Sequence, residues 1–166
     1  PQLSAILNVS KIANKKGIPA IADGGIRGSN DIVKALAAGA SSVMMGSMLA
    51  GTEESPGITL TREDGKYKVI RGMASFGAAI GRESRENNKD VSKDKEFEDI
   101  TPEGVEALVR YKGNVSEVLN KLIGGLRSGL SYNGAYNLQE LQKNAEFIRI
   151  TNSSLAESSS HDVKKY

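Results

Sequence analysis

Cysteine and tryptophan are absent from the 166 residues, and aromatic side chains make up only 5% of them. Without cysteine the chain forms no disulfides. A net charge of +2 and few aromatics provide neither a basic stripe nor a stacking platform, which argues against a nucleic-acid partner. No apolar run approaches the roughly 18 residues of a membrane helix, and no basic-then-apolar signal opens the chain. These absences predict a cytoplasmic domain without a membrane partner.

Apolar residues recur at helical spacing in the first 45 residues, interrupted by two short apolar runs. An amphipathic helix is predicted up to Gly17, then a strand over 18–22, a helix capped by Ser29 or Asn30, and a strand over 41–45. Helix and strand alternating in this order predict an α/β fold with a parallel sheet. The residues expected to face the core are Ile6, Leu7, Val9, Ile12 and Ala13 in the first helix, and Ile32, Val33, Leu36 and Ala37 in the second.

Each of these two strands is followed by a glycine-containing loop. Asp23-Gly24-Gly25 follows the first strand, and Gly46-Ser47 follows the second. In parallel β/α folds ligands bind at the carboxyl ends of strands, where glycines let backbone N–H groups approach an anion. The Asp23 carboxylate would repel a phosphate but can accept hydrogen bonds from two sugar hydroxyls. The pair of loops therefore predicts a nucleotide site, with ordinary glycine turns as the alternative.

The middle of the chain has a different character. Residues 57–73 alternate apolar and polar about Asp64-Gly65, which predicts a hairpin. Residues 81–103 are dense in both charges and nearly devoid of apolar side chains, so they form either a mobile lid over a site or a solvated insertion.

The last third is predicted to be mainly helical. Asn114 and Asn137 each precede a glutamate by three residues and are expected to cap helices, the first of them running up to Gly124-Gly125. Residues 147–150 have the pattern of a strand, and a serine-rich tail follows from Thr151.

Several phrases of the sequence together resemble one enzyme family. They are IADGGIRGSNDIVKALAAGASSVMMGSMLAGTEESPG, RGMASFGAA, TPEGVEALVRYKG, IGGLRSGLSYNGA and AESSSHDV. In this order they are similar to the C-terminal half of the catalytic barrel shared by inosine-monophosphate dehydrogenase and guanosine-monophosphate reductase. The resemblance implies that residues 1–166 form the C-terminal portion of one (β/α)8 barrel domain, with a finger hairpin, a mobile flap at about 81–103 and a tail at 151–166.

The resemblance also implies roles for single residues. Asp23 would bind the ribose hydroxyls of a purine monophosphate, and Glu103 would receive a hydrogen bond from the purine N1 edge. Met73 and Ala74 would contact the base through the backbone. The glycines and serine implied around the 5′-phosphate are Gly25, Gly46 and Ser47, with Gly24 beside them.

The family's nucleophile is a cysteine, which attacks purine C2 and forms a covalent thioimidate while hydride leaves to NAD. This chain has no cysteine and opens with Pro1-Gln2 rather than Met. The resemblance therefore implies a fragment, or one piece of a longer polypeptide, in which the N-terminal half of the barrel supplies the nucleophile. It further implies a homotetramer of complete barrels.

Two enzymes of the family remain in competition. The flap lacks the Arg-Tyr pair that activates water in dehydrogenases, which favours the reductase, as does the phrase GGLRSGLSY. Ile70 also replaces a tyrosine that commonly precedes the RGM motif and contacts phosphate. Arg110-Tyr111 lies in the position of a structural strand and is not taken as that pair. The flap's length favours the dehydrogenase, with Arg85 and Glu103 as candidate catalytic residues.

The tail adds a further argument. In dehydrogenases a Glu-Ser-x segment from a neighbouring subunit completes a potassium site, which Glu157, Ser158 and Ser159 would supply through backbone oxygens; simple disorder is the alternative. We therefore expect an NAD-dependent dehydrogenase that converts IMP to XMP in guanine nucleotide biosynthesis. The alternatives are an NADPH-dependent GMP reductase and a non-catalytic purine-nucleotide-binding subunit.

Overall fold

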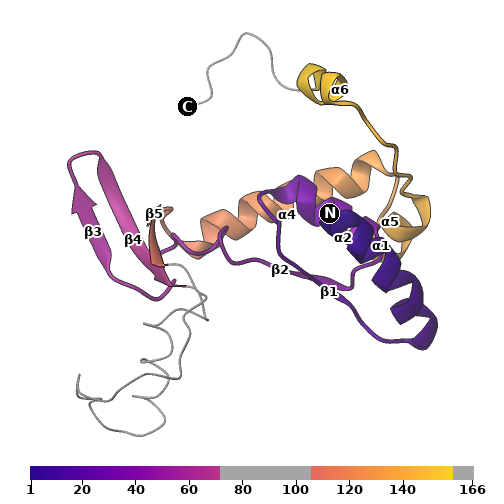
Figure 1. Ribbon diagram of the computed structural model, residues 1–166, viewed down its shortest axis with the longest axis horizontal. Helices are drawn as coiled ribbons and strands as arrows, with labels where there is room; N and C mark the ends of the chain where they lie inside the picture. The colour runs from indigo at the N-terminus through magenta and orange to yellow at the C-terminus, as the bar shows by residue number, and fades with distance from the viewer. Residues whose placement is uncertain (72–105, 159–166) are drawn as a thin grey trace, which may run out of the picture.

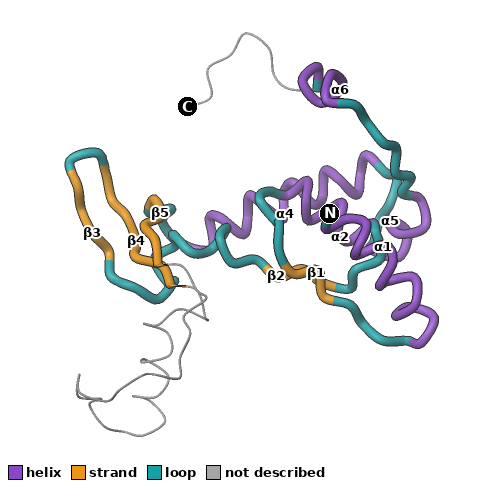
Figure 2. Tube along the Cα trace, viewed as in Figure 1, coloured by secondary structure: helices purple, strands orange, loops and turns teal. Residues whose placement is uncertain are grey.

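The computed structural model describes residues 1–71 and 106–158, and the remaining residues lie outside this description. The helices are α1 (Gln2–Ala13), followed by a 3-10 turn η1 (Asn14–Lys16), α2 (Ser29–Ala37), α4 (Val115–Tyr132), α5 (Leu138–Asn144) and α6 (Asn152–Glu157). The strands are β1 (Ile21–Asp23), β2 (Ser42–Met44), β3 (Thr59–Arg62), β4 (Gly65–Arg71) and β5 (Glu106–Arg110). The structure is thus mixed α/β (Figure 2).

Strands β1 and β2 form the predicted parallel pair, joined by helix α2. Ala22 on β1 is 3% exposed and belongs to the core, against which Val43 of β2 packs. The opposite face carries Ile21 and Met44, which are 61% and 51% exposed. Because side chains alternate between the faces of a strand, the sheet is covered by helices on one face only.

Helix α2 packs against both α4 and α5 and forms the centre of the core. Its inward side carries Ile32, Ala35 and Leu36, each under 7% exposed, while the predicted Val33 and Ala37 pack at the edge of the core. The expected cap at Ser29 or Asn30 was wrong, because the residue before the helix is Gly28 in an extended conformation. The Asp31 carboxylate instead accepts a hydrogen bond from the Arg27 N–H at 3.0 Å.

Helix α4 corrects another expectation, because it continues through Gly124-Gly125 to Tyr132. A Cβ atom at Gly125 would come within 2.1 Å of Ser29 Oγ, and one at Gly129 within 2.4 Å of Val33 Cγ2. These two glycines therefore allow α4 to lie directly against α2. Packing between the helices outweighs the low helix propensity of glycine at these positions.

Helices α2, α4 and α5 form a helical layer. A second sheet lies away from this layer, at the end of the molecule opposite α5 (Figure 1). Strands β3 and β4 form the predicted hairpin, with Arg62 paired to Gly65 across a two-residue turn. Strand β5 pairs with the other edge of β4. The Tyr67 hydroxyl donates to Asp64 Oδ2 at 2.6 Å, and the Arg62 guanidinium lies 5.8 Å from the Tyr67 ring centroid.

Side-chain hydrogen bonds mark the starts of helices α4 and α5. The Asn114 side chain accepts a hydrogen bond from the Ser116 N–H, and the Asn137 side chain accepts one from the Glu140 N–H, so both predicted caps are confirmed. Gln142 Nε2 donates to the carbonyls of Leu36 and Ala40 and so ties α5 to the end of α2.

Two apolar segments are less buried than their patterns predicted. On α1, Ile6 is buried, whereas Leu7, Val9 and Ile12 are 40%, 57% and 62% exposed. The expected strand over 147–150 was wrong, because that segment is irregular and has no pairing strand in the part of the chain the structure describes. None of the described helices has both the length and the apolarity required to span a lipid bilayer.

Candidate functional site

The loops after β1 and β2 emerge at the same edge of the parallel sheet. Asp23 is paired in register with Met44, so the two strands end at the same level. The structure therefore brings the predicted phosphate-loop residues to one edge, namely Gly24, Gly25, Gly46 and Ser47. All four are exposed. This edge is the candidate site.

The first loop needs glycine because of its backbone. Gly24 and Gly25 have φ angles of 96° and 76°, which other residues rarely adopt. A Cβ atom at either position would have no neighbour within 4 Å among the described atoms, so packing does not require glycine there. Consecutive positive-φ glycines leave a strongly curved, side-chain-free backbone beside the end of β1. Such backbone can present N–H groups to an anion.

Asp23 lies at the carboxyl end of β1 with its side chain exposed. Its backbone carbonyl accepts a hydrogen bond from Gln2 Nε2 at 2.6 Å, which ties the end of the strand to α1. Because it is paired with Met44, its side chain lies on the sheet face that no helix covers. The carboxylate is therefore available to a ligand at the same edge as the glycine loops.

The second loop begins with a tight turn at Gly46. The Gly46 carbonyl accepts hydrogen bonds from the N–H groups of Leu49 and Ala50, at 3.1 and 3.0 Å. The Lys112 ammonium donates to the carbonyls of Ser47 and Met48, at 2.7 and 2.9 Å. Sequence reasoning missed Lys112, because it lies 64 and 65 positions after the residues it binds, and the phrase TPEGVEALVRYKG that contains it gave it no role.

The backbone around Lys112 is itself well anchored. Its N–H donates to the Gly51 carbonyl at 2.8 Å, and the neighbouring Gly113 carbonyl accepts from the Glu53 N–H at 2.8 Å. The buried Lys68 of β4 donates to the carbonyls of Glu53 and Ser55. The turn after β2 is thereby joined to the second sheet.

Tyr111 has a structural contact here. Its hydroxyl donates to Glu53 Oε2 at 3.2 Å, and the Lys66 ammonium lies 6.0 Å from its ring centroid. Desolvation, and then the hydrogen bond to the Glu53 carboxylate, raise the pKa of Tyr111. These contacts tie Tyr111 to the turn after β2.

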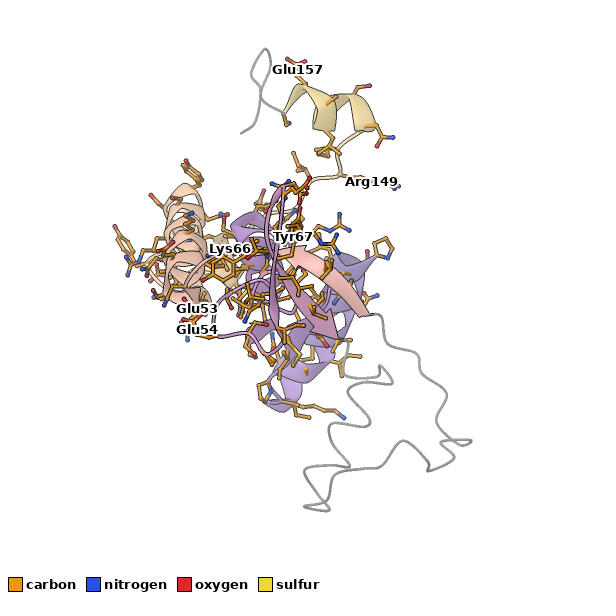
Figure 3. The ribbon with its side chains drawn as sticks, turned by 90° about the vertical axis from the view of Figure 1, so that its left-hand side faces the viewer. Glu53, Glu54, Lys66, Tyr67, Arg149 and Glu157 are labelled. Atoms are coloured by element: carbon orange, nitrogen blue, oxygen red, sulfur yellow. The ribbon has the colours of Figure 1, made fainter. Side chains whose placement is uncertain are left out.

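Other predicted site residues are not brought to this edge. Glu157 and Ser158 end α6, both exposed, and Figure 3 shows Glu157 far from Glu53 and Glu54. The part of the chain that is described contains no cluster of three or more His, Cys, Asp or Glu side chains fit for a metal. The remaining predicted residues lie outside the described ranges: Met73, Ala74, Arg85, Glu103 and Ser159, together with the flap.

An apolar groove of about 120 Å³ lies between helix α1 and strand β1. Its walls include Ile6 and Val9 from the helix and Ile21 from the strand, and do not include Asp23 or Gly46. The groove is therefore separate from the loop edge.

Comparison with known proteins places this geometry in context. The protein-family model described as "IMP dehydrogenase / GMP reductase domain" matches residues 1–161. The chain is 55% identical to inosine-5′-monophosphate dehydrogenase of Nitrosopumilus maritimus over 98% of its own length, and 48% identical to GMP reductase of Leishmania donovani over 99%. These matches span about a third of each relative, 34% and 33%.

A solved structure agrees with the sequence matches. The chain superposes with a TM-score of 0.85 on a GMP reductase variant from Trypanosoma brucei, crystallised with guanosine 5′-monophosphate. The sequences are 46% identical, and the match covers 99% of this chain and 32% of that one.

Proposed function

Because this chain belongs to the IMP dehydrogenase / GMP reductase family, we propose that it forms the C-terminal part of a catalytic (β/α)8 barrel and binds a purine nucleoside monophosphate at the loop edge. The observation that carries the proposal is the in-register parallel pairing of β1 and β2. It aligns an exposed carboxylate at Asp23 with two glycine loops. Asp23 would bind the ribose hydroxyls, and the loops would receive the 5′-phosphate.

A complete barrel is supported by the uncovered side of the parallel sheet. Ile21 and Met44 stand exposed on the helix-free face, as residues of a barrel interior would when the other strands are missing. The apolar groove between α1 and β1 lies where a preceding strand would pack. The relatives are about three times as long as the matched region, so the additional chain can supply those strands and the nucleophilic cysteine.

The proposed reaction is the NAD-dependent oxidation of IMP to XMP. Several dehydrogenase relatives are 50% or more identical to this chain, including those of Nitrosopumilus maritimus at 55% and Aquifex aeolicus at 52%. NAD would accept the hydride from purine C2. Within this chain Glu103 and Arg85 are the proposed catalytic residues, and Met73 and Ala74 the proposed contacts to the base.

A potassium ion at the tail is a second part of the proposal. Helix α6 ends at Glu157 with Ser158 as its C-terminal cap, and the family resemblance points to backbone oxygens of Glu157, Ser158 and Ser159 as the ligands. Such oxygens suit a hard cation. The proposed site would be completed by a neighbouring subunit of a homotetramer, with the β3–β4 hairpin as a further contact between subunits.

GMP reductase is the second candidate, favoured by the solved structure at a TM-score of 0.85 and by the absence of an Arg-Tyr pair in residues 81–103. The two reactions are separated by assaying a protein that joins this chain to the rest of the barrel. IMP with NAD should yield NADH if it is a dehydrogenase. Ammonia from GMP with NADPH, without NADH from IMP, would replace the dehydrogenase by the reductase. Tight nucleotide binding with neither activity would favour a non-catalytic subunit.

The site itself is tested by Asp23→Ala. Losing the ribose hydrogen bonds should weaken IMP binding by roughly 1.5–3 kcal/mol, the range for hydrogen bonds to a charged group. The 2′,3′-dideoxy monophosphate should bind the parent with a similar loss and should not distinguish parent from variant. Glu146→Ala, at an exposed acid away from the loop edge, is the matched control. Parent-like affinity of Asp23→Ala for IMP in calorimetry would refute the ribose assignment.

A further inference from the structure

Lys112 joins two parts of the molecule that are distant in sequence. Its ammonium donates to the carbonyls of Ser47 and Met48, and its own N–H donates to the Gly51 carbonyl. A Cβ atom at Gly51 would lie 2.3 Å from the Arg110 carbonyl oxygen, so the two backbones are in direct contact there. One residue therefore holds both ends of the turn that contains the second glycine loop.

These bonds fix the direction of the turn's N–H groups. Across a trans peptide the carbonyl of one residue and the N–H of the next point in opposite directions, and none of the described peptides is cis. With the Ser47 carbonyl bound to Lys112, the Met48 N–H points away from the ammonium. The Gly46 carbonyl is bound to the N–H groups of Leu49 and Ala50, so the Ser47 N–H points away from that hydrogen-bonded turn. Lys112 thus lies on the carbonyl side of the loop.

The base of the Lys112 side chain is fixed from the second sheet. Lys112 lies two residues beyond β5, and Arg110 at the end of that strand pairs with Tyr67 of β4. The intervening Tyr111 donates its N–H to the Lys66 carbonyl at 2.9 Å. A lysine side chain usually loses considerable rotamer entropy when it is held in one geometry. For Lys112 this cost is confined to the side chain, because β-sheet pairing already orders the backbone that precedes it.

We propose that Lys112 is a positioning residue that holds the Gly46–Ala50 turn in the conformation that receives the 5′-phosphate. The inference rests on the proposed nucleotide site and extends it to a residue outside both glycine loops. Lys112 acts through the two carbonyls it binds, so it orients the loop without contacting the phosphate. Removing its ammonium should release the turn and weaken phosphate recognition, while leaving recognition of the nucleoside part intact.

The experiment compares Lys112→Met with the parent, in a protein that joins this chain to the rest of the barrel. Methionine keeps the length of the side chain and removes its three donors. Calorimetry would measure the affinities for IMP and for inosine, which lacks the phosphate. We expect IMP binding to weaken about tenfold, close to the lower end of the range for hydrogen bonds to a charged group, and inosine binding to stay unchanged. Lys112→Arg keeps the charge and donors and should recover part of the loss.

Lys66→Met is the matched control, because Lys66 is a neighbouring cation on the second sheet whose side chain faces Tyr111. It should bind IMP as the parent does. Equal losses for IMP and inosine in Lys112→Met, or no loss for IMP, would overturn the positioning role. If the parent itself bound IMP no better than inosine, the proposed phosphate site would fail, and this inference with it.

Discussion

The helical layer and the C-terminal segment 145–158 contain similar apolar side chains but differ sharply in packing. In the helical layer Leu141 is 0% exposed and Ala35 is 2% exposed. In the C-terminal segment Ile148 is 85% exposed and Leu155 is 58% exposed. Figure 1 shows α6 standing apart from α2, α4 and α5. An apolar pattern thus gives a core only where the chain also provides the surface that covers it.

The helical layer provides that surface through close backbone approach. Gly125 and Gly129 bring α4 onto α2, and Gln142 binds the carbonyls at the end of α2. Helix α2 connects β1 to β2, whose in-register pairing forms the loop edge. Among the described residues, the proposed nucleotide site therefore lies beside the well-packed helices.

Truncating a core side chain should show the difference between the regions most strongly. Leu141→Ala should lower the free energy of unfolding by about 2–5 kcal/mol, because it leaves a cavity between α5 and α2. Ile148→Ala, in the C-terminal segment, should change it by about 0.5 kcal/mol or less. Urea unfolding followed by circular dichroism measures both. Similar losses for the two variants would mean that segment 145–158 is also packed in solution.

Adding one methyl group along α4 should have a smaller and position-dependent effect. Gly129→Ala would place its Cβ 2.4 Å from Val33 Cγ2, so the helices must separate, at a cost of about 1–3 kcal/mol. Gly124→Ala meets no described atom within 4 Å and gains helix propensity, so it should stabilise by up to about 1 kcal/mol. Thermal unfolding of the two variants should therefore give shifts of opposite sign. Destabilisation by both would contradict the packing described for this face.

The sequence predicted the parts whose signals are local. The alternation of helix and strand, the hairpin about Asp64-Gly65 and the caps at Asn114 and Asn137 depend on neighbouring residues, and the structure confirms them. At the candidate site, the alignment of Asp23 with the glycine loops followed from the rule that parallel strands end at one edge.

One local signal failed, because Gly28 and not Ser29 or Asn30 precedes α2. The other failures lie where contacts between distant segments decide the structure. Gly124-Gly125 looked like a helix end, but packing against α2 carries α4 through it. Residues 147–150 have a strand pattern, yet a strand needs a partner and none pairs with them in the described ranges. Lys112 is tied to the loop after β2 only by the fold. Each of these depends on residues more than twenty positions away, or on a partner segment.

The smallest expected effect concerns how the two regions begin their helices. At α2 partial burial would raise the pKa of Asp31, but hydrogen bonds from the Arg27 N–H and from Lys34 outweigh it and lower the pKa below its ordinary value. The charged form is thus favoured in the folded protein. Its stabilisation is present above the ordinary pKa of 3.8 and is lost as the pH falls through the lower pKa of the folded state.

Asp31→Asn should therefore destabilise at pH 7 by about 0.3–1 kcal/mol, the value of an acid in the first turn of a helix, and its unfolding curve should approach that of the parent as the pH falls through the lowered pKa of Asp31. Lys34→Gln removes only the ion pair and should cost less, because exposed pairs contribute little.

At α6 the side chain of Thr151 caps the helix by accepting a hydrogen bond from the Ser154 N–H. Thr151→Ala should leave global unfolding unchanged, because α6 stands apart from the core. A pH-independent loss in Asp31→Asn would contradict a contribution from the charge of this carboxylate.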